Sequence, residues 1–338
     1  MNVHDRSRKP VIALAMGDPA GISPELTAKL ACLDETRARA RLIVIGDRRV
    51  FDEGARVAGV KADLPDVPPS TDPRTIGGDT AFMDLGHLDP ATIERGVASQ
   101  AGGAFALENY RRALTLARDG QADAVCFTPF NKKAMRLARA EYDDEIAFST
   151  EIAGLKTPAS EFNVLDRLWN ARVTSHIPLK DVASLLSVER IRRALKLTDA
   201  CMRRAGFATP RIAVAGLNPH AGDGGNFGRE EIDVIEPAVM AGRAEGIAAE
   251  GPFPADTVFL RAKNGAFDAV LTMYHDQGQI AMKLMGFERG VTVQGGLPVA
   301  ITTPAHGTAY DIAGRGIANV QAMSNALAIA ARMGAAAH

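Results

Sequence analysis

The sequence predicts an α/β fold built around a largely parallel sheet. Short apolar runs typical of buried strands alternate with amphipathic segments typical of helices, and no period repeats along the 338 residues. The run 267–278, FDAVLTMYHDQG, is the clearest case, because a buried strand ends there in four polar residues and a glycine. Open α/β sheets present functional groups at such strand ends. A polar turn without a function explains this stretch equally well when it is taken alone.

In the first half of the chain, a buried strand at 10–17 precedes a Gly-rich loop and a helix start. Ser23 is the expected N-cap of this helix, and Pro24 suits its first position. The backbone N–H groups of the loop could meet an anion, but the spacing is not that of a G-x-G-x-x-G fingerprint, and a plain capping turn is an equal alternative. Further expectations are strands at 41–47 and 122–129, a helix ending near Gly59, an irregular connection at 61–79 and a long helix at 96–117.

The second half continues the alternation. Lys132 and Lys133 begin a helix, where adjacent lysines usually face solvent and less often serve a site. Expected after them are strand-like residues 162–179, a helix at 188–204, a strand at 211–218, a helix at 229–244, a Pro-rich turn at 251–259, a short helix at 279–285, a strand at 290–296 and a final Ala-rich helix.

The composition excludes several classes of protein. Lys and Arg number 39 against 40 Asp and Glu, so no bulk charge attracts nucleic acid or an anionic membrane. No apolar run is long enough for a membrane span, and the N-terminus lacks the apolar region of a signal peptide. Cys32, Cys126 and Cys201 lie far apart without CxxC spacing. We therefore expect a cytoplasmic protein with reduced thiols.

Three histidines follow predicted buried strands: His176, His220 and His275. The carboxyl ends of parallel strands lie along one edge of a sheet, so these imidazoles could form a site for zinc, iron, cobalt or manganese. Three histidines that are hydrogen-bonded separately explain the pattern equally well. Neither an HExxH helix nor a nucleophile elbow is present, so the sequence does not support a metalloprotease or an α/β-hydrolase.

Six segments occur in order along the chain: GDPAGISPE, TSHIPLKDV, GLNPHAGDGG with FGREE, GPFPADTVF, MYHDQGQIAMKLMGF and HGTAYDIAGRG. Together they resemble the signature segments of the 4-hydroxythreonine-4-phosphate dehydrogenase family. The resemblance implies an isocitrate/isopropylmalate dehydrogenase-like fold, with two α/β domains around a largely parallel sheet and the active site in the cleft between them. The approximate domains are 1–125 plus 276–338 on the cofactor side, and 126–275 for substrate, metal and dimerisation.

The resemblance also implies cofactors and a partner. The cofactor is NAD or NADP, and the metal is a divalent ion such as Zn, Co, Mn, Mg or Ni on His176, His220 and His275. The protein is implied to be a homodimer with its site at the subunit interface, acting on a small hydroxy acid. The segment HGTAYDIAGRGIAN also resembles the cofactor loop of isopropylmalate dehydrogenases, so the implied cofactor-binding residues are Gly295, His306, Gly307, Thr308, Ala309 and Asp311.

The implied chemistry is oxidation of a secondary alcohol. A metal-bound hydroxyl has a lowered pKa and is held for hydride loss to nicotinamide, and the same metal would stabilise the enolate left when a β-keto acid product loses its carboxyl group. The implied catalytic residues are Asp256, Asp276, Lys283 and Lys132, of which Lys283 also binds substrate.

The chain departs from the family pattern at the implied substrate-binding positions. Ser149, beside Thr150, replaces a histidine, Thr292 replaces an asparagine, and Ile301 replaces an arginine. Ala305 also stands where an acidic residue is usual. Loss of the arginine removes charged hydrogen bonds worth about 1.5–3 kcal/mol each. Arg289, Thr302 or Lys133 are alternative phosphate ligands.

Two substrate classes suit this altered pattern. One is a phosphorylated four-carbon hydroxy acid, such as 4-hydroxythreonine phosphate or a threonate phosphate. The other is an unphosphorylated cis-dihydrodiol dicarboxylate from aromatic degradation. A non-catalytic metal- or ligand-binding protein and a metal-dependent hydrolase are the alternatives from other classes, and both predict no dependence on NAD.

Overall fold

The computed structural model describes residues 9–142, 144–156 and 159–336 and divides into two compact units. The first unit combines the N-terminal part of the chain, up to Ser160, with the C-terminal part from Val291 onward. The second unit is the continuous segment Glu161–Gly290. Because the chain leaves the first unit and returns to it, the two ends of the sequence share one core.

The sheet of the first unit has the strand order β3-β4-β2-β1-β5-β12-β11. All neighbouring pairs are parallel except β11 with β12, which is antiparallel. The strands β1 and β5 are fully buried, as expected for central strands covered on both faces. The strand bounds are β1 (Val11–Ala15), β2 (Arg41–Gly46), β3 (Asp66–Val67), β4 (Thr80–Asp84), β5 (Ala124–Phe127), β11 (Val291–Gly295) and β12 (Ala300–Pro304).

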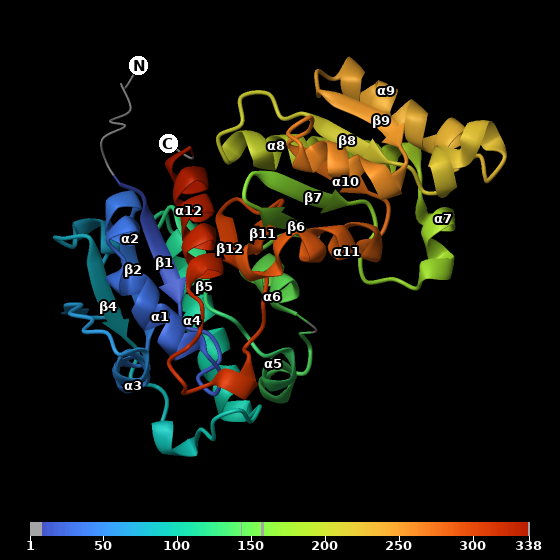
Figure 1. Ribbon diagram of the computed structural model, residues 1–338. Coiled ribbons are helices and arrows are strands. Elements are labelled where there is room, and N and C mark those ends of the chain that lie inside the picture. Colours follow the sequence, from blue (N-terminus) through green and yellow to red (C-terminus); the bar gives the residue numbers. More distant parts are fainter. Residues whose placement is uncertain (1–8, 143, 157–158, 337–338) are drawn as a thin grey trace, which may run out of the picture. The chain divides into compact units, whose positions relative to one another are not determined.

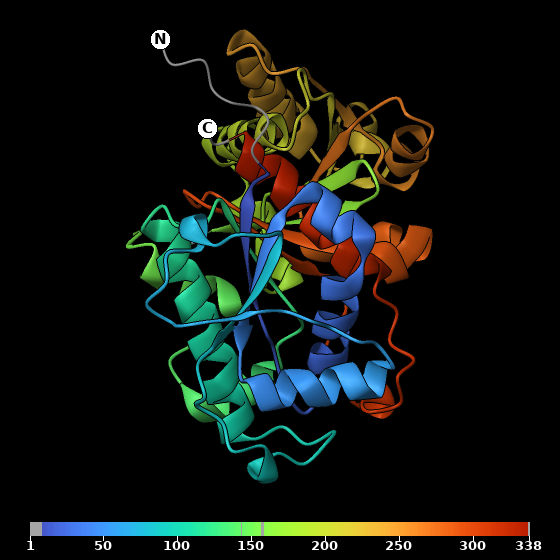
Figure 2. The ribbon, with the colours of Figure 1, turned by 90° about the vertical axis from the view of Figure 1, so that its left-hand side faces the viewer.

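Helices cover both faces of this sheet (Figure 2). The long helix α4 packs on one face, whereas α1 and α12 pack on the other. The helices of the unit are α1 (Ser23–Cys32), α2 (Asp34–Arg39), α3 (Arg48–Ala58), α4 (Gln100–Arg118), α5 (Lys132–Ala138), α6 (Glu145–Ile152) and α12 (Gln321–Ala335), with short turns η1 (Pro73–Thr75), η2 (Pro90–Thr92) and η7 (Tyr310–Ile312).

The second unit contains a sheet in the order β6-β7-β10-β8-β9 (Figure 1). Only β6 is antiparallel to its neighbour, β7. The helices α10 and α11 pack on one face of the sheet, and α8 and α9 cover the other. The bounds are β6 (Ser160–Leu165), β7 (Leu168–Arg172), η3 (Leu179–Asp181), α7 (Val182–Leu185), α8 (Val188–Arg204), β8 (Ile212–Ala215), η4 (Pro219–Gly225), η5 (Glu231–Ile235), α9 (Glu236–Ala244), β9 (Ala249–Phe253), α10 (Ala255–Lys263), β10 (Ala269–Thr272), α11 (His275–Gly286) and η6 (Phe287–Arg289).

The predicted fold class is confirmed, with three local differences. Ser23 is not an N-cap: it is the first residue of α1, and its hydroxyl donates to the carbonyl of Pro129 at 2.7 Å. The segment 251–259 is not a turn, because it completes β9 and begins α10. The predicted helix at 229–244 begins with a π-turn, η5. The first two differences involve partners far away in the sequence: Pro129 for Ser23, and β8, which pairs with β9.

The boundaries of the two units also differ from the expected domains. The expected boundaries at 125 and 275 fall at 160 and 290 instead. The helix α5 packs on α4, and Phe148 of α6 joins the core of the first unit. The first unit therefore extends beyond residue 125 and includes both helices. The helix α11 packs on β7 and β10, which keeps it in the second unit.

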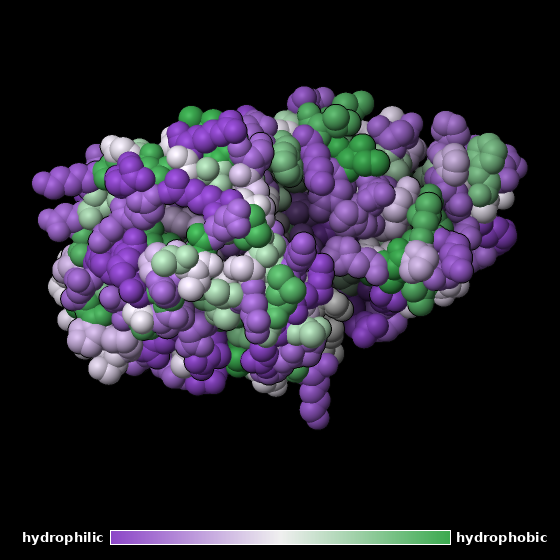
Figure 3. Space-filling view, turned by 90° about the horizontal axis from the view of Figure 1, so that it is seen from below, coloured by the Kyte–Doolittle hydropathy of each residue, from purple (hydrophilic) through white to green (hydrophobic). Residues whose placement is uncertain are grey.

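Within the described ranges, no helix is both long and apolar enough to cross a membrane. Figure 3 shows one face of the molecule, on which polar side chains predominate and apolar side chains gather in small separate groups. Scattered exposed apolar residues of this kind are normal for a folded protein surface.

Candidate active site

Three parallel neighbouring strands of the second unit, β7, β10 and β8, end at one edge of the sheet. His176 follows β7, His275 follows β10, and His220 follows β8. The sequence prediction that three histidine-bearing strand ends share an edge is therefore confirmed. His275 is not in a loop, however, because it is the first residue of α11.

His176 and His275 lie side by side. Their ring centroids are 5.5 Å apart and the rings are tilted by 48°. His275 Nδ1 lies 2.7 Å from a carboxylate oxygen of Asp276. With the proton on Nδ1 donated to that carboxylate, the lone pair of Nε2 is available as a ligand.

His220 is placed differently. It is exposed within a left-handed turn, and its nearest recorded aromatic neighbour is Phe227, with ring centroids 6.1 Å apart. Across residues 9–142, 144–156 and 159–336, no three His, Cys, Asp or Glu side chains come together as a metal-binding group within one chain. The structure thus brings two of the three predicted ligands together and leaves the third apart.

Two further polar side chains, which the sequence analysis missed, connect these strand ends. The Thr174 hydroxyl donates to the carbonyl of Met273 at 2.7 Å and so joins the end of β7 to the end of β10. Gln277 accepts a hydrogen bond from Met273 N–H and donates to the carbonyl of Gly216, each at 2.7 Å. These bonds satisfy backbone groups beyond the last sheet pair. Both residues lie within quoted motifs, but sequence alone does not indicate their bonding.

The other predicted catalytic residues are exposed. Asp256 lies in the first turn of α10, and Lys132 begins α5 in the first unit. Lys283 lies eight residues beyond His275 on α11, which corresponds to about 12 Å along the helix axis. Its Nζ lies 5.5 Å from the ring centroid of Phe287. Lys283 and His275 could therefore contact different parts of a bound molecule from the same helix.

The predicted substrate-binding residues lie in the first unit, and two of them are fully interior. Ser149 is 0% exposed and Ile301 is 1% exposed. The Ser149 hydroxyl lies 2.6 Å from Tyr110 Oη and donates to Gln294 Oε1 at 2.7 Å. Ile301 pairs with Gln294 across β11 and β12 and belongs to the apolar core of the unit. Burial raises the pKa of the Tyr110 hydroxyl, so that group stays neutral in this network.

Thr150 and Thr292 are also largely buried, at 9% and 8% exposure. The Thr150 hydroxyl donates to the carbonyl of Ile146. A mostly apolar cavity of about 30 Å³ adjoins Ser149 and Ile301. That volume suits roughly a single water molecule. Ser149, Thr292 and Ile301, where the family pattern is altered, thus lie in the packed interior, and the Ile301 side chain itself offers no charge to a substrate.

The residues predicted to bind the cofactor lie mainly in the loop of residues 306–318, which follows β12. Thr308 is buried, whereas Gly307 and Asp311 are exposed and Ala309 has a left-handed backbone. His306 Nδ1 lies 3.0 Å from the carbonyl of Gly307. Gly295 is the buried last residue of β11. The loop therefore exposes the carboxylate of Asp311, whereas Thr308 of the same loop is buried.

The loop of residues 306–318 is tied to the first strand–helix connection by hydrogen bonds. Ile22 N–H donates to the carbonyl of Thr308 at 3.0 Å, and the Tyr310 hydroxyl donates to the Asp18 carboxylate. Asp18 is 1% exposed. Burial raises the pKa of Asp18, while the hydrogen bonds from Tyr310 and Ala20 act in the opposite direction.

A buried ion pair fastens the end of the same loop. Lys29 Nζ bonds to Glu25 Oε1 at 2.7 Å and to the carbonyls of Gly316 and Ala318 at 2.9 and 2.8 Å. Glu25 Oε1 also accepts from Ala318 N–H at 2.7 Å. The sequence does not reveal this role of Glu25 and Lys29, because the backbone groups that they bind come from the other end of the chain.

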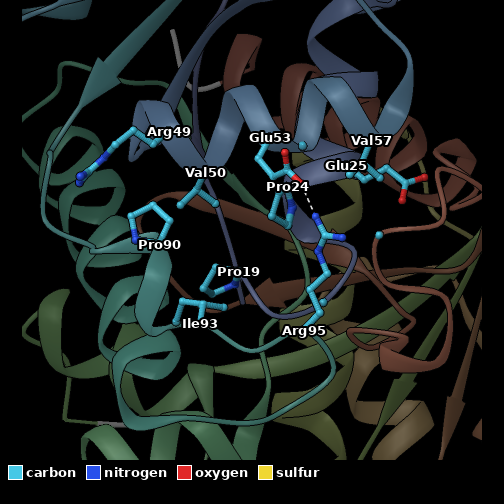
Figure 4. Close-up of a pocket in the computed structure, with 13 residues that line it drawn as sticks. Pro19, Pro24, Glu25, Arg49, Val50, Glu53, Val57, Pro90, Ile93 and Arg95 are labelled. Carbon is cyan, nitrogen blue, oxygen red and sulfur yellow. Dashed lines mark hydrogen bonds and ion pairs between the residues drawn. The ribbon is translucent and has the colours of Figure 1, made fainter.

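A cavity of about 250 Å³ lies between α1, α3 and the segment 90–95 (Figure 4). Prolines and aliphatic side chains line it together with Arg49 and Arg95. Figure 4 shows Arg95 pointing toward Glu53, its ion-pair partner, while Arg49 pairs with Asp47. Both guanidinium groups are thus already paired with carboxylates. The cavity contains none of the residues predicted for the site.

These features define an α/β protein with a histidine-bearing edge on one largely parallel sheet and an anchored loop after a strand of another. Comparison with known proteins extends this description. The family model described as "Pyridoxal phosphate biosynthetic protein PdxA" matches residues 38–330. The chain therefore belongs to the PdxA family.

Individual relatives agree with this assignment. A protein from Rhizobium meliloti (strain 1021), named putative 4-hydroxythreonine-4-phosphate dehydrogenase 2, is 63% identical over 97% of this chain and 94% of its own length. A D-threonate 4-phosphate dehydrogenase from Cupriavidus necator is 40% identical over 94% of this chain and 95% of its own. The crystal structure of a 4-hydroxythreonine-4-phosphate dehydrogenase from Klebsiella pneumoniae matches with a TM-score of 0.83 at 35% identity, covering 96% of this chain and 98% of that one.

Proposed function

We propose that this protein is a metal-dependent, NAD(P)-linked dehydrogenase that oxidises a secondary alcohol of a phosphorylated four-carbon hydroxy acid. The broader class follows from family membership: the chain is an oxidoreductase that acts on CH–OH groups. The observation that supports the finer proposal is the pair His176 and His275 at the carboxyl edge of the sheet, with Asp276 bonded to His275.

The donor set fits a divalent metal such as zinc or cobalt. Two imidazoles lie side by side, and the Asp276 carboxylate leaves His275 Nε2 free to bind a cation. When bound, the metal would act as a Lewis acid that lowers the pKa of the substrate hydroxyl and polarises the carbonyl formed on oxidation. Lys283 would bind an anionic group of the substrate, and Asp256 would supply a further acid.

The third metal ligand in this proposal is His220 of a second copy of the chain, in a homodimer. Within one chain, His220 does not join the other two histidines among the described residues. The helix α11 and the first residue of η6 also expose an apolar stripe at helical spacing, with Ile280 60% exposed, Leu284 84% and Phe287 43%. An exposed stripe of this kind suits coverage by another protein surface.

The cofactor would bind at the loop of residues 306–318. Asp311 is exposed on this loop and could accept hydrogen bonds from ribose hydroxyls. The bonds from Tyr310 to Asp18 and from Ile22 to Thr308 hold the loop before a ligand arrives, which lowers the ordering cost of binding. A β-keto acid product would subsequently lose carbon dioxide.

Complementation between two inactive variants tests the shared site. His176→Ala and His220→Ala should each lower kcat/KM by at least about 100-fold with D-threonate 4-phosphate or 4-phosphohydroxy-L-threonine and NAD or NADP, since loss of a metal ligand exceeds the 10- to 100-fold loss typical of an outer partner. After co-refolding the two variants, about a quarter of the sites should be intact, because half of the dimers are mixed and each has one intact site.

The control is His87→Ala, which removes a histidine stacked on Phe105 in the first unit. This variant should retain activity. If the mixture of variants stays inactive although mixed dimers are demonstrated by mass spectrometry, the three histidines do not form a site shared between subunits. If neither NAD nor NADP raises the melting temperature of the metal-loaded wild type, the dehydrogenase proposal itself is contradicted.

The second candidate substrate is an unphosphorylated carboxylated diol, such as a cis-dihydrodiol dicarboxylate. The burial of Ser149 in a hydrogen-bond network and of Ile301 in the apolar core favours this class, because neither side chain is available to a phosphate. Steady-state assays with both classes discriminate between them. Efficient turnover of 4-phosphohydroxy-L-threonine would contradict the unphosphorylated alternative.

A further inference from the structure

The turn that presents His220 has a backbone that few sequences adopt. Six consecutive residues, from His220 to Gly225, have positive φ angles of 54°, 53°, 81°, 45°, 64° and 102°. Three of these six carry side chains, and residues other than glycine are disfavoured in this conformation. A run of left-handed residues persists only where surrounding groups determine it, so the turn requires an anchor.

The anchor is the carboxylate of Glu231, which is 3% exposed. Its Oε1 accepts from Leu217 N–H and Asn218 N–H, both at 2.7 Å. Its Oε2 accepts from Asn218 Nδ2 at 2.9 Å. These donors lie two and three residues before the left-handed run, so the carboxylate fixes the backbone that leads into it.

The packing around this carboxylate is close. A Cβ atom on Gly222 would lie 2.7 Å from Glu231 Oε2, and one on Gly216 would lie 3.1 Å from Oε1. The turn therefore wraps directly around the carboxylate. Among the described residues, no cation forms an ion pair with Glu231, so N–H donors alone compensate its buried charge. Hydrogen bonds to a charged acceptor are shorter and stronger than neutral ones.

We infer that Glu231 is a positioning residue for His220: its carboxylate holds the left-handed turn in the conformation that presents the imidazole to the metal. This inference rests on the proposed function, in which His220 is a metal ligand. Glu231 itself neither ligates the metal nor touches the substrate. A glutamine at position 231 would retain only one accepting oxygen. Only a carboxylate can accept hydrogen bonds at both the Oε1 and the Oε2 position.

The experiment compares Glu231→Gln and Glu231→Ala with a matched control. Glu230→Gln alters the neighbouring carboxylate, which contacts the Asn218 side chain at 2.7 Å but none of the backbone N–H groups. Two readouts are independent of turnover. They are the affinity of the full-length protein for Co²⁺, measured by chelator competition, and hydrogen exchange of the amides of Leu217 and Asn218 in the metal-free protein.

We expect Glu231→Ala to weaken Co²⁺ binding by 10- to 100-fold, the usual effect of losing an outer-sphere partner. Glu231→Gln should weaken it by a smaller factor, since two backbone bonds can persist, and Glu230→Gln should leave it within about twofold. Exchange at Leu217 and Asn218 should accelerate in the Glu231 variants, without acceleration in the sheet strands.

Unchanged Co²⁺ affinity in a folded Glu231→Gln or Glu231→Ala protein, together with a lowered melting temperature, would overturn the inference and leave Glu231 a merely structural residue. His220→Ala separates this outcome from failure of the proposed function. If His220→Ala binds Co²⁺ as tightly as wild type, the proposed metal site is contradicted. If only the Glu231 variants bind normally, the positioning role alone is contradicted.

Discussion

Two loops, one in each unit, each direct backbone polar groups inward, and a charged side chain of opposite sign in each case bonds to these groups. The loop of residues 216–228 begins after β8 with backbone N–H groups directed inward, and the Glu231 carboxylate accepts them. The loop of residues 306–318 directs the carbonyls of Gly316 and Ala318 inward, and the Lys29 ammonium group donates to them. Glu25 then balances the charge of Lys29. The charge of the anchoring side chain thus matches the backbone groups that it holds: a carboxylate accepts from N–H groups, and an ammonium group donates to carbonyls.

The two anchors also differ in how they depend on distant sequence. Glu231 lies about 14 residues after the backbone that it holds, within the same unit segment. Lys29 and Glu25 bind carbonyls and an amide nearly 290 residues away. The first loop can therefore form with its local segment, whereas the second requires the two ends of the chain to meet.

The largest expected effect is that of Lys29→Met. The lysine side chain is 18% exposed and its partner Glu25 only 2%, so the substitution leaves a buried carboxylate without its cation. We expect a loss of about 3–5 kcal/mol in unfolding free energy, measured by urea denaturation, and a raised KM for the proposed nicotinamide cofactor. The double variant Glu25→Gln/Lys29→Met should recover part of the stability. Equal stability of the single and double variants would show that the ion pair is not the anchor.

A matched pair of glycine substitutions compares how closely the two loops are packed. Gly222 and Gly314 have similar positive φ angles of 81° and 78°, so alanine costs about 1–2 kcal/mol in backbone strain at either position. The new Cβ would meet Glu231 Oε2 at 2.7 Å in the first case and Arg95 Nη1 at 2.8 Å in the second. Arg95 is half exposed and can move away, whereas Glu231 is buried and bonded.

Gly222→Ala should therefore lose about 2–4 kcal/mol, because overpacking adds to the strain, and Gly314→Ala should lose only about 1–2 kcal/mol. Chemical denaturation of the two variants measures the difference. Equal losses would mean that the carboxylate anchor yields as easily as an exposed arginine.

Tyr310→Phe should cost about 2 kcal/mol at neutral pH, because it removes one hydrogen bond to the buried Asp18 carboxylate. The pKa of Asp18 in the folded protein is raised above its ordinary value of 3.8. Its charge therefore destabilises the fold at neutral pH, and this penalty is relieved as the pH falls through the raised pKa toward 3.8.

The Tyr310 hydrogen bond lowers the pKa of Asp18, so its removal raises that pKa further. The stability difference between wild type and Tyr310→Phe should consequently shrink as the pH is lowered through this window. Urea denaturation at a series of pH values measures the difference. A loss that is constant with pH would show that Tyr310 does not act through the ionised carboxylate.

Periodicity predicted the helices and central strands well, because their apolar faces are recorded in local sequence. The helix α8 spans the predicted residues 188–204, and Gly59 ends α3 with a φ of 67°. The strand β12 was not predicted, although Ile301 lies in it, since AITTP acquires its identity by pairing with β5 and β11. Short strands without alternation depend on their neighbours.

The candidate site divides in the same way. That His176, His220 and His275 follow parallel neighbouring strands was predictable, because each apolar run ends visibly in the sequence. It was not predictable that only His176 and His275 lie together. His220 is separated from them because it lies in a left-handed turn, which the sequence does not reveal. Neither the network of Ser149 with Tyr110 nor the burial of Glu231 has a local signature.

The sequence by itself determined the fold class, the family and the strand ends that carry the candidate functional residues. Each of these can be recognised from apolar runs and short motifs of neighbouring residues. The tertiary structure decided which charges are buried and what compensates them. Asp18, Glu25 and Glu231 look like ordinary surface acids in the sequence, yet each is at most 3% exposed. Burial of a carboxylate depends on donors that only the folded chain places beside it: Tyr310 beside Asp18, Ala318 beside Glu25 and Leu217 beside Glu231.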